Sequence, residues 1–346
     1  MLLSGILRPI YKTVCLAFSI AAVMALSACD QQPSSQQSSV DPGILRVVTT
    51  VSPITSLTEN IGGERIHLQG IIPEGTNSHT YEPAPSVAKL LSTADIIILN
   101  GLFLEEPSLK MAQESKLDDT IILQLGNLAI TEDEWIYDFS FPQSNGHPNP
   151  HLWTDPLLAL KYAELILEVL VSQDPKNAGY YQNNFTLLQS RIEELDARIH
   201  QAVATIPINN RKLLTYHDSF PYFSMRYGFT VIGAVQPSDF REPSAREVAN
   251  LIKQIRLSKV PAIFGSETFP SDIMEQIAKE SGASFIEGLR DDDLPGKSGD
   301  NNHTYLGLML SDIEIIVSSL GGAINALDEF NVGLVFEGPS TATYPE

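Results

Sequence analysis

Histidine is the residue type of this sequence best suited to transition-metal chemistry, because imidazole is the commonest ligand of such metals in proteins. The chain contains seven histidines. Three of them, His79, His151 and His217, lie in loops just past the ends of expected strands or helices, where binding groups gather in open α/β sheets. One such histidine alone would more simply be a hydrogen-bonded loop residue. The three together predict a metal site.

The other four histidines are not expected to bind metal. His67 lies within a strand pattern and His200 on the polar side of a long helix, so both are expected to be structural or solvated. His303 lies at the start of the last expected helix, where a local polar contact is the simplest role. His147 shares a loop with His151, but its Gly and Pro neighbours indicate a mobile side chain.

Cysteine is expected to carry a lipid rather than to bind metal. Arg8 and Lys12 precede an uncharged apolar run at 13–28, which is the layout of a secretory signal. This run is too short for a transmembrane helix, which needs ~20 apolar residues. It ends in LSAC, which looks like a bacterial lipobox, so we expect cleavage of residues 1–28 and a diacylglycerol on Cys29. The alternative is a plain signal peptide with a chance cysteine near its cut site.

The expected mature chain has a single cysteine and a negative net charge. Cys15 would leave with the signal, so disulfides and Cys-based metal sites are not expected. Residues 29–43 are rich in Gln and Ser and predict a flexible tether beside a membrane. Because the signal holds two basic and no acidic residues, its removal takes the formal net charge from −20 to −22. Such acidity argues against nucleic-acid binding and is compatible with attracting cations.

Short β-branched runs alternate with helical patterns along the remaining chain, which predicts an α/β fold with parallel sheets flanked by helices. About 300 residues exceed what one core usually serves, so we expect two lobes, at 44–173 and 207–330, and a loose tail at 331–346. The expected strands are 44–51, 66–72, 95–99, 120–125, 212–216, 230–235, 262–264 and 284–287. The expected helices, apart from the one between the lobes, are 53–61, 156–171, 220–227, 244–257, 270–281 and 305–320.

One long helix is expected to join the two lobes, at 174–206. Apolar residues recur there at steps of three and four, which is the stripe of an amphipathic helix, and Pro207 ends it. A helix over 175–206 would be ~48 Å long at 1.5 Å per residue. As the only link between the lobes, a rigid helix would restrict hinge motion.

Four stretches of sequence carry a family resemblance. They are HTYEP from His79, PHLWTDP around His151, HDSFPYF from His217 and the acidic turn LRDDDLPG at 289–296. The chain resembles the zinc- and manganese-binding solute-binding proteins of ABC importers over nearly its whole mature length, from Leu45 to about Gly322. The resemblance implies a metal held between two lobes, no enzymatic activity, and a partner permease with its ATPase. It also implies a monomer, anchored by lipid to the outer face of the cytoplasmic membrane.

The resemblance also implies a ligand set. His79 and His151 would be the ligands from the first lobe and His217 one from the second, with an aspartate as the fourth. Aligning the family's Asp-x-Leu pattern selects Asp292, and Asp291 stays open. Three imidazoles and one carboxylate suit Zn²⁺. Many manganese binders of this family have Glu where His217 stands, so zinc is favoured here and manganese is the alternative.

Further carboxylates and one insert lie near these motifs. Glu82, Asp155 and Asp218 are candidates to orient the imidazoles through their second N–H groups, although Asp155 is equally well placed as a helix N-cap. The insert at 131–151 is acidic and aromatic where some zinc-binding relatives carry a His-rich loop. We expect it to be a surface loop near the mouth of the site.

Two other functions compete with metal delivery. A zinc hydrolase would need an open coordination position for water. The sequence has no HExxH motif, and a carboxylate as fourth ligand would close the site. A surface adhesin is the second alternative, although that role does not require four converging ligands.

Overall fold

The computed structural model describes residues 43–268 and 272–345. The expected signal at 1–28, the expected lipidation site Cys29 and nearly all of the expected tether lie outside the described residues.

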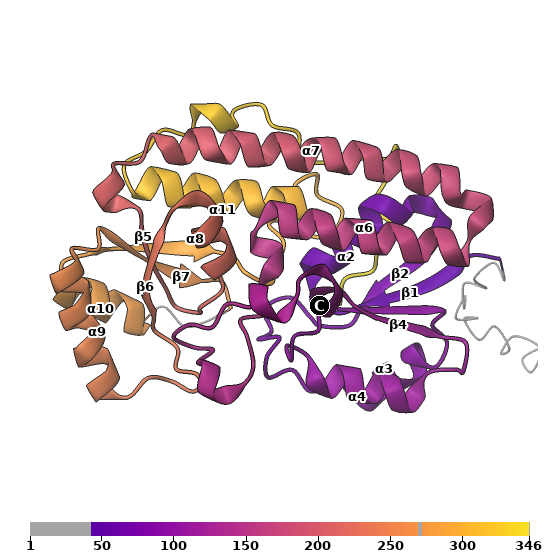
Figure 1. Ribbon diagram of the computed structural model, residues 1–346, viewed down its shortest axis with the longest axis horizontal. Coiled ribbons are helices and arrows are strands. Elements are labelled where there is room, and N and C mark those ends of the chain that lie inside the picture. The colour runs from indigo at the N-terminus through magenta and orange to yellow at the C-terminus, as the bar shows by residue number, and fades with distance from the viewer. Residues whose placement is uncertain (1–42, 269–271, 346) are drawn as a thin grey trace, which may run out of the picture. The chain divides into compact units, whose positions relative to one another are not determined.

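Two four-stranded parallel sheets form the framework of the described chain (Figure 1). The first contains β1 (Leu45–Thr49), β2 (Ile66–Gly70), β3 (Ile96–Leu99) and β4 (Ile121–Gln124) in the order β2-β1-β3-β4. The second contains β5 (Lys212–Thr215), β6 (Thr230–Ala234), β7 (Ala262–Ser266) and β8 (Ser284–Leu289) in the order β6-β5-β7-β8. Both sheets therefore repeat one topology, and the predicted two-lobed α/β fold is confirmed.

Helices flank both sheets, and some of them were not expected. The described helices besides α7 are α2 (Ser52–Gly62), α3 (Pro85–Leu91), α4 (Glu106–Ser115), α5 (Leu125–Ala129), α6 (Pro156–Gln173), α8 (Pro221–Tyr227), α9 (Ala245–Ser258), α10 (Asp272–Ser281) and α11 (Tyr305–Ser319). The sequence did not predict α3, α4 and α5. These three are short and bury few side chains, so the apolar spacing that reveals a helix hardly develops in them.

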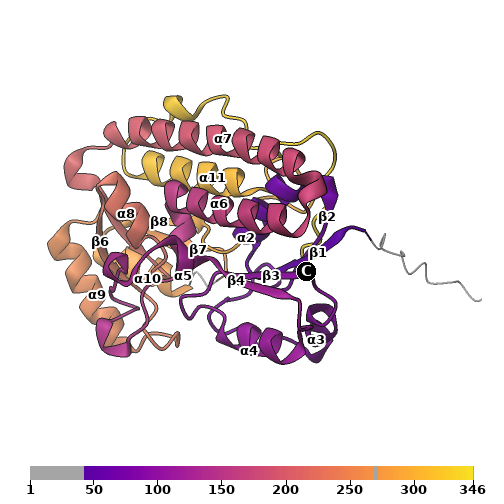
Figure 2. The same ribbon diagram turned by 45° about the vertical axis from the view of Figure 1, so that its right-hand side comes forward.

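The predicted linking helix is present as α7 (Ala178–Ala204), which is 27 residues long and follows a 3-10 turn at Pro175–Asn177. Its apolar stripe is buried, as the spacing predicts, with Tyr181, Leu188, Ile192, Leu195, Ile199 and Val203 facing inward. Figure 2 shows that α7 runs beside α6 and α11. The helix is therefore packed along much of its length.

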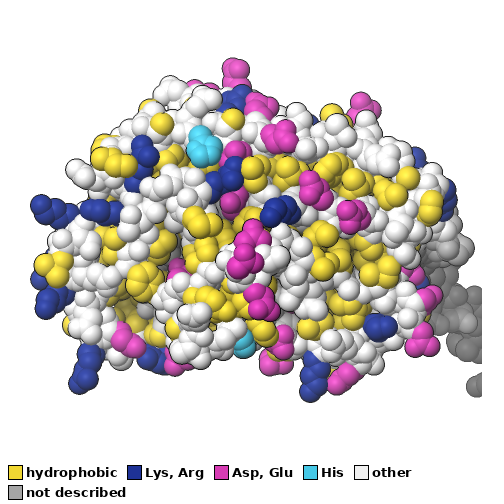
Figure 3. All heavy atoms as spheres, in the orientation of Figure 1, with side chains coloured by type: hydrophobic (Ala, Val, Ile, Leu, Met, Phe, Trp, Pro, Cys, Tyr) yellow, Lys and Arg dark blue, Asp and Glu magenta, His cyan; other side chains and the backbone are white. Residues whose placement is uncertain are grey.

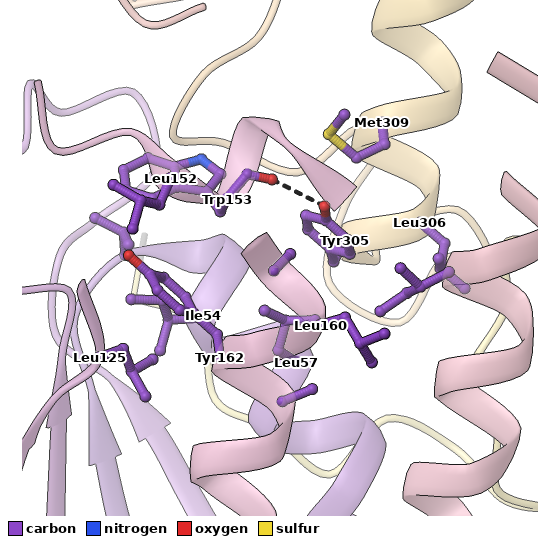
Figure 4. Packing of buried hydrophobic residues seen from close by; sticks show 14 of the residues in the cluster. Ile54, Leu57, Leu125, Leu152, Trp153, Leu160, Tyr162, Tyr305, Leu306 and Met309 are labelled. Atoms are coloured by element: carbon purple, nitrogen blue, oxygen red, sulfur yellow. Dashed lines mark hydrogen bonds between the residues drawn. The ribbon is translucent and has the colours of Figure 1, made fainter. Parts of the chain in front are cut away.

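One apolar core extends through both lobes, and a second, smaller one lies within the second lobe between its sheet and helices α9 and α10. The first core joins Leu57 of α2, Tyr162 of α6 and Leu188 of α7 with Phe223 of α8 and Leu306 of α11, and all five are almost fully buried. Burying one such side chain is worth about 1.5–3 kcal/mol. Because α8 and α11 belong to the second half of the chain, moving the lobes apart would expose this core. Figure 4 shows part of it, around Tyr162 and Leu306.

The residues from 331 onward are not a loose tail. The backbone N–H groups of Thr341 and Ala342 donate to Oε1 of the buried Glu59 in α2, at 2.7 and 2.9 Å. The Thr343 N–H donates to Leu68 O at 3.0 Å, and the Gly70 N–H donates to Thr343 O at 2.9 Å. The chain thus returns to the first lobe after α11, because the backbone groups of this segment find partners there. Helix α7 is consequently not the only link between the lobes.

Replacing Glu59 tests the contribution of this returning segment to stability. In Glu59→Ala the N–H groups of Thr341 and Ala342 lose their acceptor, and we expect the free energy of unfolding to fall by about 1–3 kcal/mol. Urea unfolding would measure the change. Glu64→Ala, at an exposed position one turn further on, is the control. Equal stabilities of the two variants would contradict the expectation.

Candidate metal site

Three imidazole nitrogens meet between the two sheets. The Nε2 atoms of His79 and His151 are 3.2 Å apart, and Nε2 of His217 lies 3.1 Å from each of them. Tetrahedral Zn²⁺ with N ligands at 2.0–2.1 Å would separate those ligands by ~3.3 Å. The three side chains that the sequence selected are therefore spaced as the ligands of one metal ion would be, in a group that could hold such an ion.

The three histidines lie in loops next to strands and helices that fix their positions. His79 lies in the loop between β2 and α3, and His217 comes two residues after β5 ends. His151 directly precedes the 3-10 turn Leu152–Thr154, which leads into α6. The Thr154 hydroxyl donates to His151 O at 2.9 Å and closes this turn. Loops at the carboxyl ends of parallel strands thus bring together residues far apart in the sequence.

Two amide side chains orient the imidazoles. Nδ1 of His151 lies 2.7 Å from Asn149 Oδ1, and Nδ1 of His217 lies 2.7 Å from Gln236 Oε1. An amide oxygen only accepts, so each Nδ1 carries the proton and each Nε2 keeps its lone pair for a cation. Neither amide was predicted from the sequence. Asn149 could have been found from its place two residues before His151, whereas Gln236 is close to its imidazole only through the pairing of β5 with β6.

Two of the three carboxylates expected in this orienting role have other partners, and the third lies at the surface. Asp155 accepts from Leu157 N at 2.9 Å and caps α6, as its alternative interpretation predicted. Asp218 Oδ2 accepts from Ser140 N at 3.2 Å, and Glu82 is exposed. Proximity in sequence was a poor guide for these three because the backbone turns within each loop decide which way a neighbouring side chain faces.

The aspartate nearest to the imidazoles is Asp291, not Asp292. Oδ2 of Asp291 lies 4.0 Å from His217 Nε2, and its side chain is 5% exposed. Asp292 instead accepts a hydrogen bond from the Ser78 hydroxyl through Oδ2. Both aspartates thus remain candidates for the fourth ligand, because Asp291 lies nearer to the imidazoles whereas Oδ1 of Asp292 is buried without a hydrogen-bond partner. A run of three aspartates after a strand does not reveal which side chain faces the cavity.

Burial disfavours the charged forms of two of the imidazoles, those of His79 and His151, and of two carboxyls in the acidic turn, those of Asp292 and Asp293. Burial, together with the neighbouring His217, holds the pKa of His79 and of His151 well below the usual value. Burial and the nearby Asp291 raise the pKa of Asp292 well above its usual range, and burial raises that of Asp293 to about 7. Neutral imidazoles beside crowded carboxyls are the environment in which a divalent cation is most favourable.

Aromatic rings enclose the site. The His79 ring stacks on Phe240, with centroids 4.4 Å apart and an interplanar angle of 19°, and Phe141 lies 5.4 Å from His79. Phe141 belongs to the insert at 131–151 and is buried, so this insert closes over the imidazoles as well as lying near the mouth. His147 of the same insert stacks on Phe103 at 4.0 Å and lines the same cavity as His79. His147 was expected to be mobile, but the contact of its ring with Phe103 indicates that the side chain is held in place.

The remaining histidines have the local roles expected of them. His67 is an exposed residue of β2, and His200 is half exposed with Nε2 3.8 Å from Asp196 Oδ1. His303 is buried, with Nδ1 3.3 Å from Pro295 O and Nε2 3.6 Å from Glu74 Oε1.

Three imidazoles that could hold a metal ion, with a buried aspartate 4.0 Å from one of them, lie between two α/β lobes, which is the arrangement of a metal-binding protein of the two-lobed solute-binding class. Residues 47–319 match the family described as zinc-uptake complex component A periplasmic (ZnuA), and the chain belongs to this family.

Curated relatives and solved structures agree with this membership. The chain is 28% identical over 305 residues to the metal ABC transporter substrate-binding lipoprotein FimA of Streptococcus parasanguinis, covering 88% of this chain and 97% of FimA. It is 29% identical over 311 residues to the manganese-binding lipoprotein MntA of Halalkalibacterium halodurans, covering 89% and 99%. The periplasmic zinc binding protein TroA from Treponema pallidum superposes with a TM-score of 0.74 at 27% identity, covering 80% and 99%. The chain is therefore a substrate-binding component of a metal ABC importer and not an enzyme.

Exchanging single aspartates tests the fourth ligand. Asp291→Asn removes the carboxylate nearest to the imidazoles, and we expect metal affinity to fall more than ~100-fold, beyond the effect usual for residues that only support a ligand. Asp292→Asn is the matched variant one residue away and should lose much less. Competition with a chromogenic chelator would give both affinities. The reverse order would restore Asp292 as the ligand.

Proposed function

We propose that this protein binds one divalent transition-metal ion, with zinc preferred over manganese, and delivers it to the permease of an ABC importer. The ligands in this proposal are Nε2 of His79, His151 and His217 and the carboxylate of Asp291. The main support for it is that the three Nε2 atoms lie 3.1–3.2 Å from one another and that amide side chains orient the imidazoles of His151 and His217.

The donor atoms support zinc. Three nitrogens and one carboxylate oxygen match tetrahedral Zn²⁺, whereas Mn²⁺ prefers a harder set richer in oxygen. The names of the relatives do not separate the two metals, because TroA is named for zinc and MntA for manganese at similar identity to this chain. The preference for zinc therefore rests on His217, which supplies nitrogen at one of the four positions.

The proposed location is the cell envelope. FimA and MntA are named as lipoproteins, and the LSAC stretch ending at Cys29 supports the same anchor here. Among the residues in the described ranges, no helix is long and apolar enough to cross a membrane. We therefore propose a lipid-anchored monomer on the outer face of the cytoplasmic membrane, which passes its metal to a separate permease and ATPase.

The charge on the surface fits a cation carrier better than a nucleic-acid binder. On the face shown in Figure 3, Asp and Glu side chains lie across the middle, and several Lys and Arg side chains lie at the end formed by α9 and α10. The sequence as a whole carries a formal net charge of −20. A phosphate backbone would be repelled by such a surface, whereas a divalent cation would be attracted.

Metal release is proposed to need loop movements and small tilts of the lobes rather than wide opening. The shared core and the returning segment at 341–343 both join the lobes, in addition to α7. Crystal structures of the metal-free and loaded protein would show similar lobe orientations. A large rigid-body opening would contradict this part of the proposal.

Metal content tests the proposed function directly. Untagged protein loaded with an equimolar zinc and manganese mixture should carry one zinc per chain by mass spectrometry, because the donor set favours zinc. The double variant His79→Ala with His151→Ala should lose the metal. His200→Ala, which changes a half-exposed imidazole on α7, is the control and should keep it. Stoichiometric zinc in the double variant would show that the site is elsewhere.

A further inference from the structure

The loop after β6 covers the metal site from the second lobe. It begins at Gln236, which is 3% exposed, and it carries Phe240, whose ring stacks on His79. Phe240 has a backbone φ of +56°, in the left-handed region that side chains other than glycine adopt infrequently. Surrounding contacts must therefore hold it in that conformation. His79 is the least buried of the three imidazoles, so Phe240 covers the ligand that is otherwise most accessible.

Gln236 makes hydrogen bonds in four directions. Its N–H donates to Tyr216 O at 2.9 Å and fixes it to the residue before His217. Its Oε1 accepts from Nδ1 of His217 at 2.7 Å, and its Nε2 donates to Phe240 O at 3.3 Å. Its main-chain O accepts from the hydroxyl of Ser140, in the insert that carries Phe141, at 3.0 Å. One side chain amide thus contacts both a metal-facing imidazole and the residue covering a second imidazole.

The other end of the loop is held less firmly. Arg241 forms a two-pronged contact with Glu247 of α9, at 2.7 and 3.0 Å. These side chains are 47% and 43% exposed, and ion pairs that exposed contribute little to stability. Gln236 is therefore the buried anchor of the loop.

We propose that Gln236 is a positioning residue that couples the orientation of His217 to the placement of Phe240 over His79, so that metal release and movement of Phe240 occur as one event. This inference rests on the proposed metal site. Rotation of the Gln236 side chain would at once remove the acceptor behind His217 and free the backbone of Phe240. A bound ion would then lose support on two ligands that come from different lobes.

The rate of metal dissociation tests this coupling. Gln236→Met keeps the length of the side chain but removes both amide hydrogen bonds, and Phe240→Ala removes the ring over His79. We expect each change to raise the dissociation rate constant of zinc at least ~10-fold, the low end of the 10–100-fold loss usual for groups that orient metal ligands. Mixing the zinc-loaded protein with excess chelator in a stopped-flow instrument would measure it.

The double variant separates coupling from independent effects. If Gln236 and Phe240 act through one movement, Gln236→Met with Phe240→Ala should release zinc no faster than the faster single variant. Rate increases that multiply in the double variant, or single variants that release zinc at the wild-type rate, would overturn the proposal.

A control variant and a spectrum separate positioning from general stability. Gln254→Met loses a comparable amide bond, to Ile232 O in the same lobe, and should leave zinc dissociation unchanged. The thermal midpoint of both metal-free variants is measured as well, and zinc dissociation is compared at a temperature where both are fully folded. The visible spectrum of the cobalt-loaded form should change only in Gln236→Met, because only there does an imidazole lose its acceptor. An unchanged spectrum would overturn the proposal.

Two outcomes distinguish the absence of coupling from the absence of the metal site. A wild-type protein that takes up neither zinc nor manganese would overturn both. Wild-type uptake of zinc, with unaltered dissociation in Gln236→Met and in Phe240→Ala, would overturn the coupling alone.

Discussion

The indole of Trp153 makes the contact on which the geometry of the site depends. Its Nε1–H donates to Asp291 O at 2.8 Å, which ties the acidic turn of the second lobe to a residue two positions from His151. Its own carbonyl accepts from the Tyr305 hydroxyl at 2.8 Å, which is drawn in Figure 4. Trp153 is fully buried, so both hydrogen bonds are shielded from water. One residue of the first lobe thus holds the turn with Asp291 and the start of α11 in place.

This arrangement explains how three nitrogens from two lobes stay close without relying on a single hinge. Arg226 of α8 forms a two-pronged contact with Asp196 of α7, at 2.7 and 3.0 Å, and lies 3.5 Å from Asp155, the N-cap of α6. Arg226 thereby connects α8, which follows His217, with α7 and with the start of α6, which follows His151. On the other side of the site, Phe141 and Phe240 cover His79.

The acidic turn gives the bound ion a role in stability as well as transport. Burial raises the pKa of Asp292 and of Glu267, and neighbouring carboxylates add to both shifts. Asp312 of α11, also buried, has its pKa raised for the same reason. These groups are costly to ionise in the folded chain without a cation nearby. An ion bound to the folded state alone stabilises it by mass action, so loading and folding stability are linked.

The sequence alone determined the features that depend on local spacing. The apolar stripe of α7 appears in its own residues, and so do the eight strands and the loops that carry His79, His151 and His217. Tertiary structure decided the features that depend on residues far apart along the chain. It tied the backbone of Asp291 to Trp153, placed Gln236 and Asn149 behind the imidazoles, and docked residues 341–343 on the first lobe. Periodicity shows which face of an element is buried, whereas the partner of a polar side chain is set only when distant segments pack together.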